Sequence, residues 1–124
     1  MYELKKETVQ IGEEFDVTVR EATWGEAVER AQLWKDLETQ TMDPNTGEVT
    51  RVLHRVTVAE RMEEEMRLTL VDATLLTDKG KPVFKPGMNR EAFHDAISSL
   101  PAMWVNDWYA AVVRVNPNWS APVL

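Results

Sequence analysis

Apolar and polar residues alternate near the start of the chain, with the period of two that is typical of a half-buried strand. Segment 15–20 shows this alternation, and a weaker copy surrounds Val9 and Ile11. Gly12 and the two glutamates after it separate these segments as turn residues. The pattern predicts a β-hairpin over residues 2–21. Because an isolated hairpin is marginally stable, we expect it to lie on helices.

Helical periodicity follows in two segments, each introduced by a capping box. Thr23 and Thr57 are both followed three residues later by a glutamate, so side chains can satisfy free N–H groups of the first turn. We therefore predict helices over residues 23–42 and 58–78. The Val/Thr-rich segment 49–58 between them fits either a strand or an extended connection, with the strand slightly favoured.

The helix predicted over residues 58–78 carries an apolar stripe of Met62, Met66 and Leu70 at a spacing of four. Glutamates 63–65 lie next to this stripe, near the start of the helix. Their simplest interpretation is a solvated face that also suits the positive end of the helix dipole.

Two further helices are predicted in the last third of the chain. Asn89 can cap a short helix over residues 89–99, and Pro101 suits the first turn of a helix over residues 101–115. An Asn-Pro pair then stops this helix, and residues 116–124 form a tail.

The predicted fold is mainly α (α+β), with an N-terminal β-hairpin packed on a bundle of about four helices. The chain has 124 residues, which fits a single domain over residues 1–124 with one modest core.

Charge and composition narrow the functional classes. The formal net charge of −7 disfavours binding to nucleic acid or to an anionic membrane, because both need clustered cations. The absence of cysteine excludes disulfides, thiolate metal sites and cysteine nucleophiles. We expect no cofactor.

The helix predicted over residues 101–115 is apolar around most of its circumference. Trp104, Trp108 and Val112 lie on one face at a spacing of four, and Trp119 follows the helix stop. Such a face is either the centre of the core or a surface for a partner. These four residues are the candidate partner-binding residues, and the sequence leaves both alternatives open.

Catalytic and metal-binding signals are weak. The usual general base would have to be His54 or His94, and neither lies in a recognisable catalytic motif. Glu91 and His94 form a single Glu-x-x-His, whereas a carboxylate-bridged metal site needs a second copy on a facing helix. We expect no enzyme and no metal, and a small enzyme or metal protein that uses Glu91, His94 and Asp95 is a rival interpretation.

Several short segments, taken in order, carry a family resemblance. Strand residues 17–20 lead through Trp24 into a helix, and a Thr-capped helix follows. A Leu-Pro pair at residues 100–101 then introduces a Trp-bearing helix that closes in Asn-Pro-Asn-Trp at residues 116–119. In this order the chain resembles the small tail assembly chaperones of long-tailed bacteriophages and prophages.

This resemblance implies a non-enzymatic protein in the cytoplasm of the bacterial host. It also implies that the chain binds the helical tape-measure protein, possibly together with the tail tube protein, and that it forms a homo-oligomer. Two alternatives stay open: another phage structural protein, such as a ring-forming head–tail connector or tail terminator, and an antitoxin-like or regulatory binding module.

Overall fold

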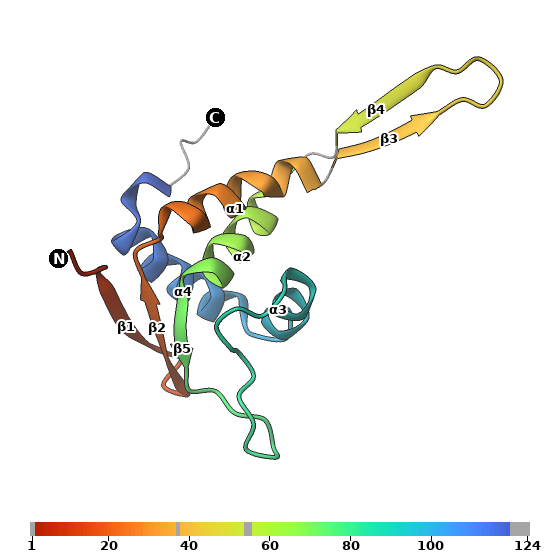
Figure 1. Ribbon diagram of the computed structural model, residues 1–124. Coiled ribbons are helices and arrows are strands. Elements are labelled where there is room, and N and C mark those ends of the chain that lie inside the picture. The colour runs from red at the N-terminus through yellow and green to blue at the C-terminus, as the bar shows by residue number, and fades with distance from the viewer. Residues whose placement is uncertain (1, 37, 54–55, 120–124) are drawn as a thin grey trace.

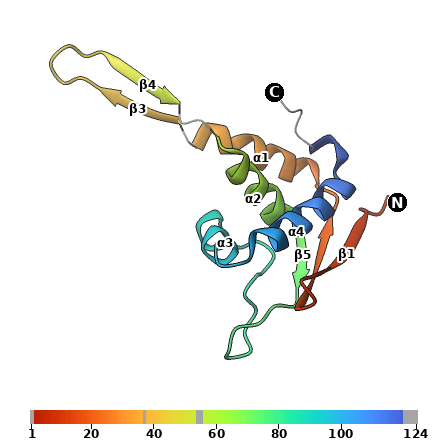
Figure 2. The same ribbon diagram turned by 180° about the vertical axis from the view of Figure 1, so that it is seen from behind.

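The computed structural model describes residues 2–36, 38–53 and 56–119 (Figures 1 and 2). Within these ranges, the side chains of residues 34–36, 38–41 and 50–53 are not described. His54, one of the two candidate general bases, and the side chain of Trp34 therefore lie outside the part of the chain that is described.

The described residues form a mixed α+β fold that confirms the predicted class: an N-terminal β-hairpin packed against helices. The strands are β1 (Lys6–Ile11), β2 (Phe15–Arg20), β3 (Glu38–Met42), β4 (Val49–Leu53) and β5 (Leu70–Ala73). The helices are α1 (Trp24–Asp36), α2 (Val58–Thr69), α3 (Arg90–Ile97) and α4 (Ala102–Val115), followed by the short 3-10 helix η1 (Pro117–Trp119). Strands β1, β2 and β5 form an antiparallel sheet in the order β1-β2-β5.

The predicted N-terminal hairpin is present, with Lys6 opposite Arg20 and Ile11 opposite Phe15. Its turn places both Gly12 and Glu13 in the left-handed region, at φ +58° and +61°. The apolar positions of β2 lie on the core side of the sheet, as the alternating pattern predicted.

The helix predicted over residues 23–42 is too long. It ends at Asp36, and residues 38–42 instead form β3, which pairs with β4 in a second hairpin. Alternating threonines favour a strand here, and the turn residues 43–47 bring the two strands into register. The hairpin β3–β4 projects from the far end of α1, away from the rest of the molecule (Figures 1 and 2).

The helix predicted over residues 58–78 also ends early, at Thr69. The chain becomes extended at Leu70, and residues 70–73 pair with β2 as the third strand of the sheet. Leu70 and Ala73 are three residues apart, a spacing that would place them on opposite faces of a regular strand. Both are nevertheless buried, because the register with β2 shifts by one residue between them, so that Leu70 lies opposite Val19 and Ala73 opposite Val17. Backbone hydrogen bonds to β2 therefore replace the helical hydrogen bonds of residues 70–73. No local sequence pattern predicts this change, because the partner strand is distant in the chain.

The last two helices are close to their predicted bounds. Asn89 caps α3 by accepting a hydrogen bond from the backbone N–H of Ala92 at 2.7 Å. Pro101 stands at the N-cap position of α4 rather than inside its first turn. Asn116 ends α4 with φ −131°, outside the left-handed region in which many helices end.

One cluster of buried side chains lies between the sheet and helices α2, α3 and α4. Its buried members are Ile11, Phe15, Val17, Val19, Met66, Leu70, Ala73, Phe84, Phe93, Ile97, Trp108, Ala111, Val112 and Trp119. Met42 and Val49, the described apolar side chains of the projecting hairpin, stay exposed outside this cluster. The body of the molecule is thus held together by a single core.

Candidate functional site

The predicted partner-binding face of α4 is turned into the domain. Trp108 and Val112 are completely buried, and the Trp108 ring lies edge-on to Phe84 and Phe93 at centroid distances of 5.0 and 5.8 Å. Trp104 is half-buried and packs edge-on against Phe15 at 6.1 Å. This face therefore belongs to the domain's own core, and Trp108 and Val112 present no surface to a partner.

Trp119 has a different position, at the edge of a surface pocket. It is 9% exposed and lines a hollow of about 290 Å³ with Trp24, Ala27 and Asn116, among other residues of α1 and the end of α4. The guanidinium of Arg30 lies 5.1 Å from the centre of its ring. Of the four predicted residues, Trp119 is the one at a described pocket.

Trp24 is the exposed aromatic residue at this pocket. Its side chain is 83% exposed, although its helical spacing with Ala27 and Val28 suggests a buried face. Val28, one turn further along α1, is also exposed. Up to Leu33, α1 buries only Leu33, so the apolar stripe that begins at Trp24 faces solvent. Periodicity identifies such a stripe but does not say which side is covered.

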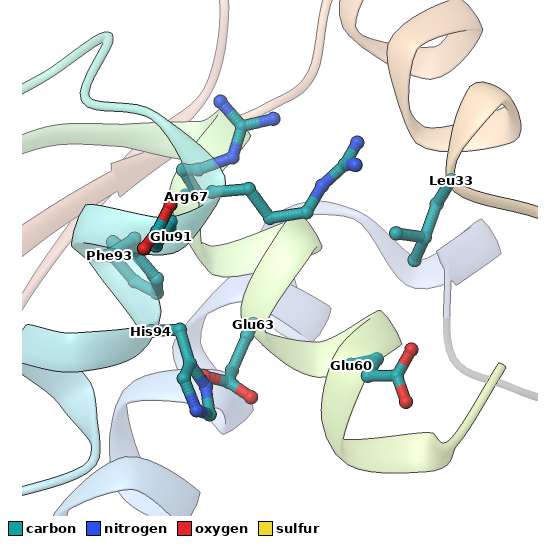
Figure 3. Close-up of a pocket in the computed structure, with 8 residues that line it drawn as sticks. Leu33, Glu60, Glu63, Arg67, Glu91, Phe93 and His94 are labelled. Carbon is teal, nitrogen blue, oxygen red and sulfur yellow. The ribbon is translucent and has the colours of Figure 1, made fainter. Parts of the chain in front are cut away.

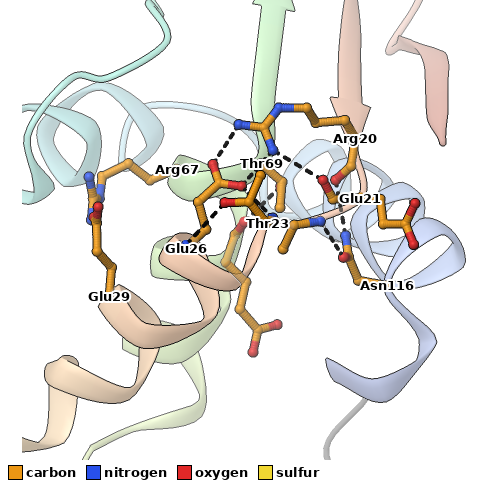
Figure 4. Close-up of polar contacts among 10 residues, drawn as sticks. Arg20, Glu21, Thr23, Glu26, Glu29, Arg67, Thr69 and Asn116 are labelled. Carbon is orange, nitrogen blue, oxygen red and sulfur yellow. Dashed lines mark hydrogen bonds and ion pairs between the residues drawn. The ribbon is translucent and has the colours of Figure 1, made fainter. Parts of the chain in front are cut away.

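Polar contacts hold the start of α1 in place (Figure 4). The backbone N–H of Thr23 donates to Glu26 at 2.8 Å, and the backbone N–H of Glu26 donates to the Thr23 hydroxyl at 3.2 Å, which confirms the capping box. Arg20 forms a two-point ion pair with Glu26 at 2.5 Å. Burial raises the pKa of Glu26, but hydrogen bonds from Arg20 and Thr23 outweigh it and hold the pKa below its usual value.

The glutamates of α2 do not form the solvated face that the sequence suggested. Glu64 is 1% exposed and Glu65 is fully buried. Arg67 donates to Glu64 at 2.7 Å, and Arg90 of α3 donates to the other Glu64 oxygen at 2.6 Å. Glu64 therefore ties α3 to α2, because a buried carboxylate requires such partners.

Glu65 makes the corresponding connection to α1 and α4. It accepts hydrogen bonds from Arg30 at 3.1 Å and from the Tyr109 hydroxyl at 2.7 Å, and Arg61 Nε lies 3.5 Å away. Burial, followed by the hydrogen bond to Glu65, raises the pKa of Tyr109 to about 12. The arginines at helical spacing from the glutamates are a local signal for these pairs, but the partners from α1, α3 and α4 lie far away in sequence.

A larger hollow of about 500 Å³ lies where α1, α2 and α3 meet (Figure 3). We call it the α2–α3 groove, and it is lined by Leu33, Glu60, Glu63, Arg67, Arg90, Glu91, Phe93 and His94. Glu63 Oε1 lies 2.7 Å from Nδ1 of His94. The hydrogen bond and the charge of Glu63 raise the pKa of His94.

The described residues of the groove do not assemble the rival metal site. His94 faces Glu63 rather than Glu91 (Figure 3). Among the described residues, no three histidine or acidic side chains are placed to hold one metal ion.

Comparison with protein-family models, curated proteins and solved structures gave no match. None of the described helices combines the length and apolar character needed to cross a membrane.

Proposed function

We propose that this protein is a non-enzymatic tail assembly chaperone of a long-tailed bacteriophage, acting in the cytoplasm of the bacterial host. Its client is the helical tape-measure protein, and the tail tube protein is a second candidate partner. The proposal rests on the sequence resemblance and on an exposed apolar surface of α1. A homo-oligomeric chaperone belongs to the same proposal.

The observation that carries the proposal is the exposure of Trp24. Tryptophan is enriched among the residues that dominate binding energy, and an 83% exposed tryptophan is costly to leave in water. With Val28 on one side and the Trp119 pocket on the other, it forms an apolar surface on a helical scaffold. This arrangement suits a client that presents an amphipathic helix. The negative net charge would help to keep such a complex soluble.

The proposal requires a long helical protein to be encoded next to this chain, and the first experiment is co-expression with that protein, followed by size-exclusion chromatography with light scattering. A soluble, co-migrating complex supports the chaperone function. A protein that leaves this neighbour insoluble, whether as a monomer or as an oligomer, contradicts it.

The variant Trp24→Ser tests the surface itself, and Met103→Ser is its control. Met103 is 72% exposed on α4, so both substitutions remove an exposed apolar side chain without opening the core. We expect Trp24→Ser to reduce recovery of the complex about tenfold or more, as loss of a binding hot spot does. Met103→Ser should leave recovery unchanged. Equal recovery with both variants would assign client binding to another surface.

The hairpin β3–β4 favours the alternative function, a ring-forming head–tail connector or tail terminator. A projecting two-stranded hairpin is marginal by itself and can be stabilised by pairing with a neighbouring subunit. In that case light scattering would give a stable oligomer of fixed size that ignores the helical neighbour.

A further inference from the structure

We propose that the α2–α3 groove binds an amphipathic helix that carries lysine or arginine beside its apolar face. This inference rests on the proposed function only in taking the partner to be helical. The groove is a second docking site in addition to the Trp24 surface. Its carboxylates require a positively charged partner segment.

The shape of the groove suits an apolar side chain. Leu33 of α1 and Phe93 of α3 contribute apolar surface to its lining, and both side chains are almost completely buried. Its volume of about 500 Å³ falls within the ~300–1,000 Å³ typical of ligand pockets. Its lining residues come from the three helices α1, α2 and α3, and a groove between helices can accept the apolar face of a further helix.

The charges around the groove favour a basic partner. Its two arginines, Arg67 and Arg90, are both ion-paired with the buried Glu64, whose single negative charge offsets one of their two positive charges, and Arg67 also lies 3.9 Å from Glu29. Glu60 and Glu91 lie on the lining from opposite helices, and no described cation forms an ion pair with either. A lysine or arginine of the partner would therefore find carboxylates on both α2 and α3.

An acidic partner would have to use Arg90, whose side chain is 42% exposed. It would compete there with Glu64 at 2.6 Å and would meet the repulsion of Glu60 and Glu91, whereas Glu63 is paired with His94. Charge complementarity therefore selects the basic helix.

The test uses three fluorescent peptides of about 18 residues, a length above the ~12–15 residues at which isolated helices are marginal. One combines leucine and lysine, one leucine and glutamate, and one serine and lysine at the same positions. Binding to the whole chain is followed by fluorescence anisotropy. We expect the leucine–lysine peptide to bind at least about tenfold more tightly than either of the others.

The variant Glu60→Gln/Glu91→Gln locates the binding. Glutamine at position 60 keeps a side-chain acceptor for the Thr57 hydroxyl, so the start of α2 is preserved. The control Glu3→Gln/Asp107→Asn removes the same charge at two exposed positions outside the groove. We expect the groove variant to weaken binding of the leucine–lysine peptide about fivefold or more, and the control to leave it nearly unchanged.

Three results would overturn the inference: equal binding of the leucine–glutamate peptide, equal binding of the serine–lysine peptide, and equal weakening by both double variants. The last would mean that the peptide responds only to net charge. Trp24→Ser is expected to bind the leucine–lysine peptide normally, because Trp24 does not line this groove. The peptide experiment therefore tests the groove separately, and the co-expression experiment with Trp24→Ser tests the chaperone proposal.

Discussion

Gly12 has the least space around it of the described glycines. It turns the N-terminal hairpin at φ +58°, and the indole of Trp104 lies directly against its Cα. A Cβ at this position would overlap the indole ring. Glycine is therefore required at this position for two reasons: the backbone has a positive φ, and the packing of α4 on the turn leaves no space for a Cβ.

We predict that Gly12→Ala lowers the free energy of unfolding by about 2 kcal/mol or more, because left-handed strain adds to overpacking against Trp104. Urea denaturation measures this change. Gly47→Ala is the matched control, since its φ is +72° but a Cβ there meets no atom. The control should cost only the backbone strain of about 1 kcal/mol. Equal costs for both variants would show that the Trp104 contact contributes nothing.

At the scale of elements, the Asn116 side chain links the end of α4 to the end of β2 and to the segment that leads into α1. Its side-chain oxygen accepts from the Ala22 N–H at 2.8 Å, and its side-chain nitrogen donates to the carbonyls of Arg20 and Val112, both at 3.1 Å (Figure 4). The side chain is nearly buried. The sequence indicates a helix stop at this residue, but two of its three side-chain partners, Arg20 and Ala22, come from about a hundred residues earlier.

We predict that Asn116→Ala destabilises the protein by about 2–4 kcal/mol, because three hydrogen bonds are lost and their backbone partners stay buried. The exposed Asn118 lies two residues away, so Asn118→Ala is the control and should change stability by less than about 0.5 kcal/mol. Thermal unfolding measures the loss of stability in each variant. Similar melting temperatures would mean that water replaces the Asn116 contacts.

At the scale of the whole molecule, Trp108 joins parts of the chain that are distant in sequence. Its ring meets Phe84 from the long connection after β5 and Phe93 from α3. Its Nε1–H has no hydrogen-bond partner among the described residues. The aromatic contacts, rather than the polar group, are therefore what this residue contributes to the core.

We predict that Trp108→Ala costs about 3–5 kcal/mol of stability, as truncation of a buried aromatic residue does. Trp108→Phe should cost less, because it keeps an aromatic ring and removes the unpaired N–H. Urea denaturation and light scattering together check this. A Trp108→Ala variant that keeps its stability but loses self-association would instead make the residue an interface.

The sequence by itself determined the elements whose signals are local. The first hairpin follows from period-two alternation around Gly12, and the starts of α1, α2 and α3 follow from the capping residues Thr23, Thr57 and Asn89. These features depend on neighbours within a few residues, so local patterns suffice to predict them.

Only the tertiary structure decided which faces are covered. Trp24 and Trp108 both belong to apolar stripes at helical spacing, yet one faces solvent and the other the core. Glu64 and Glu65 are buried because arginines from α1 and α3 reach them. Residues 70–73 become a strand because β2 supplies their hydrogen bonds. In each case the deciding partner is distant in the chain, and helical periodicity gives the direction of a side chain but not what lies opposite it.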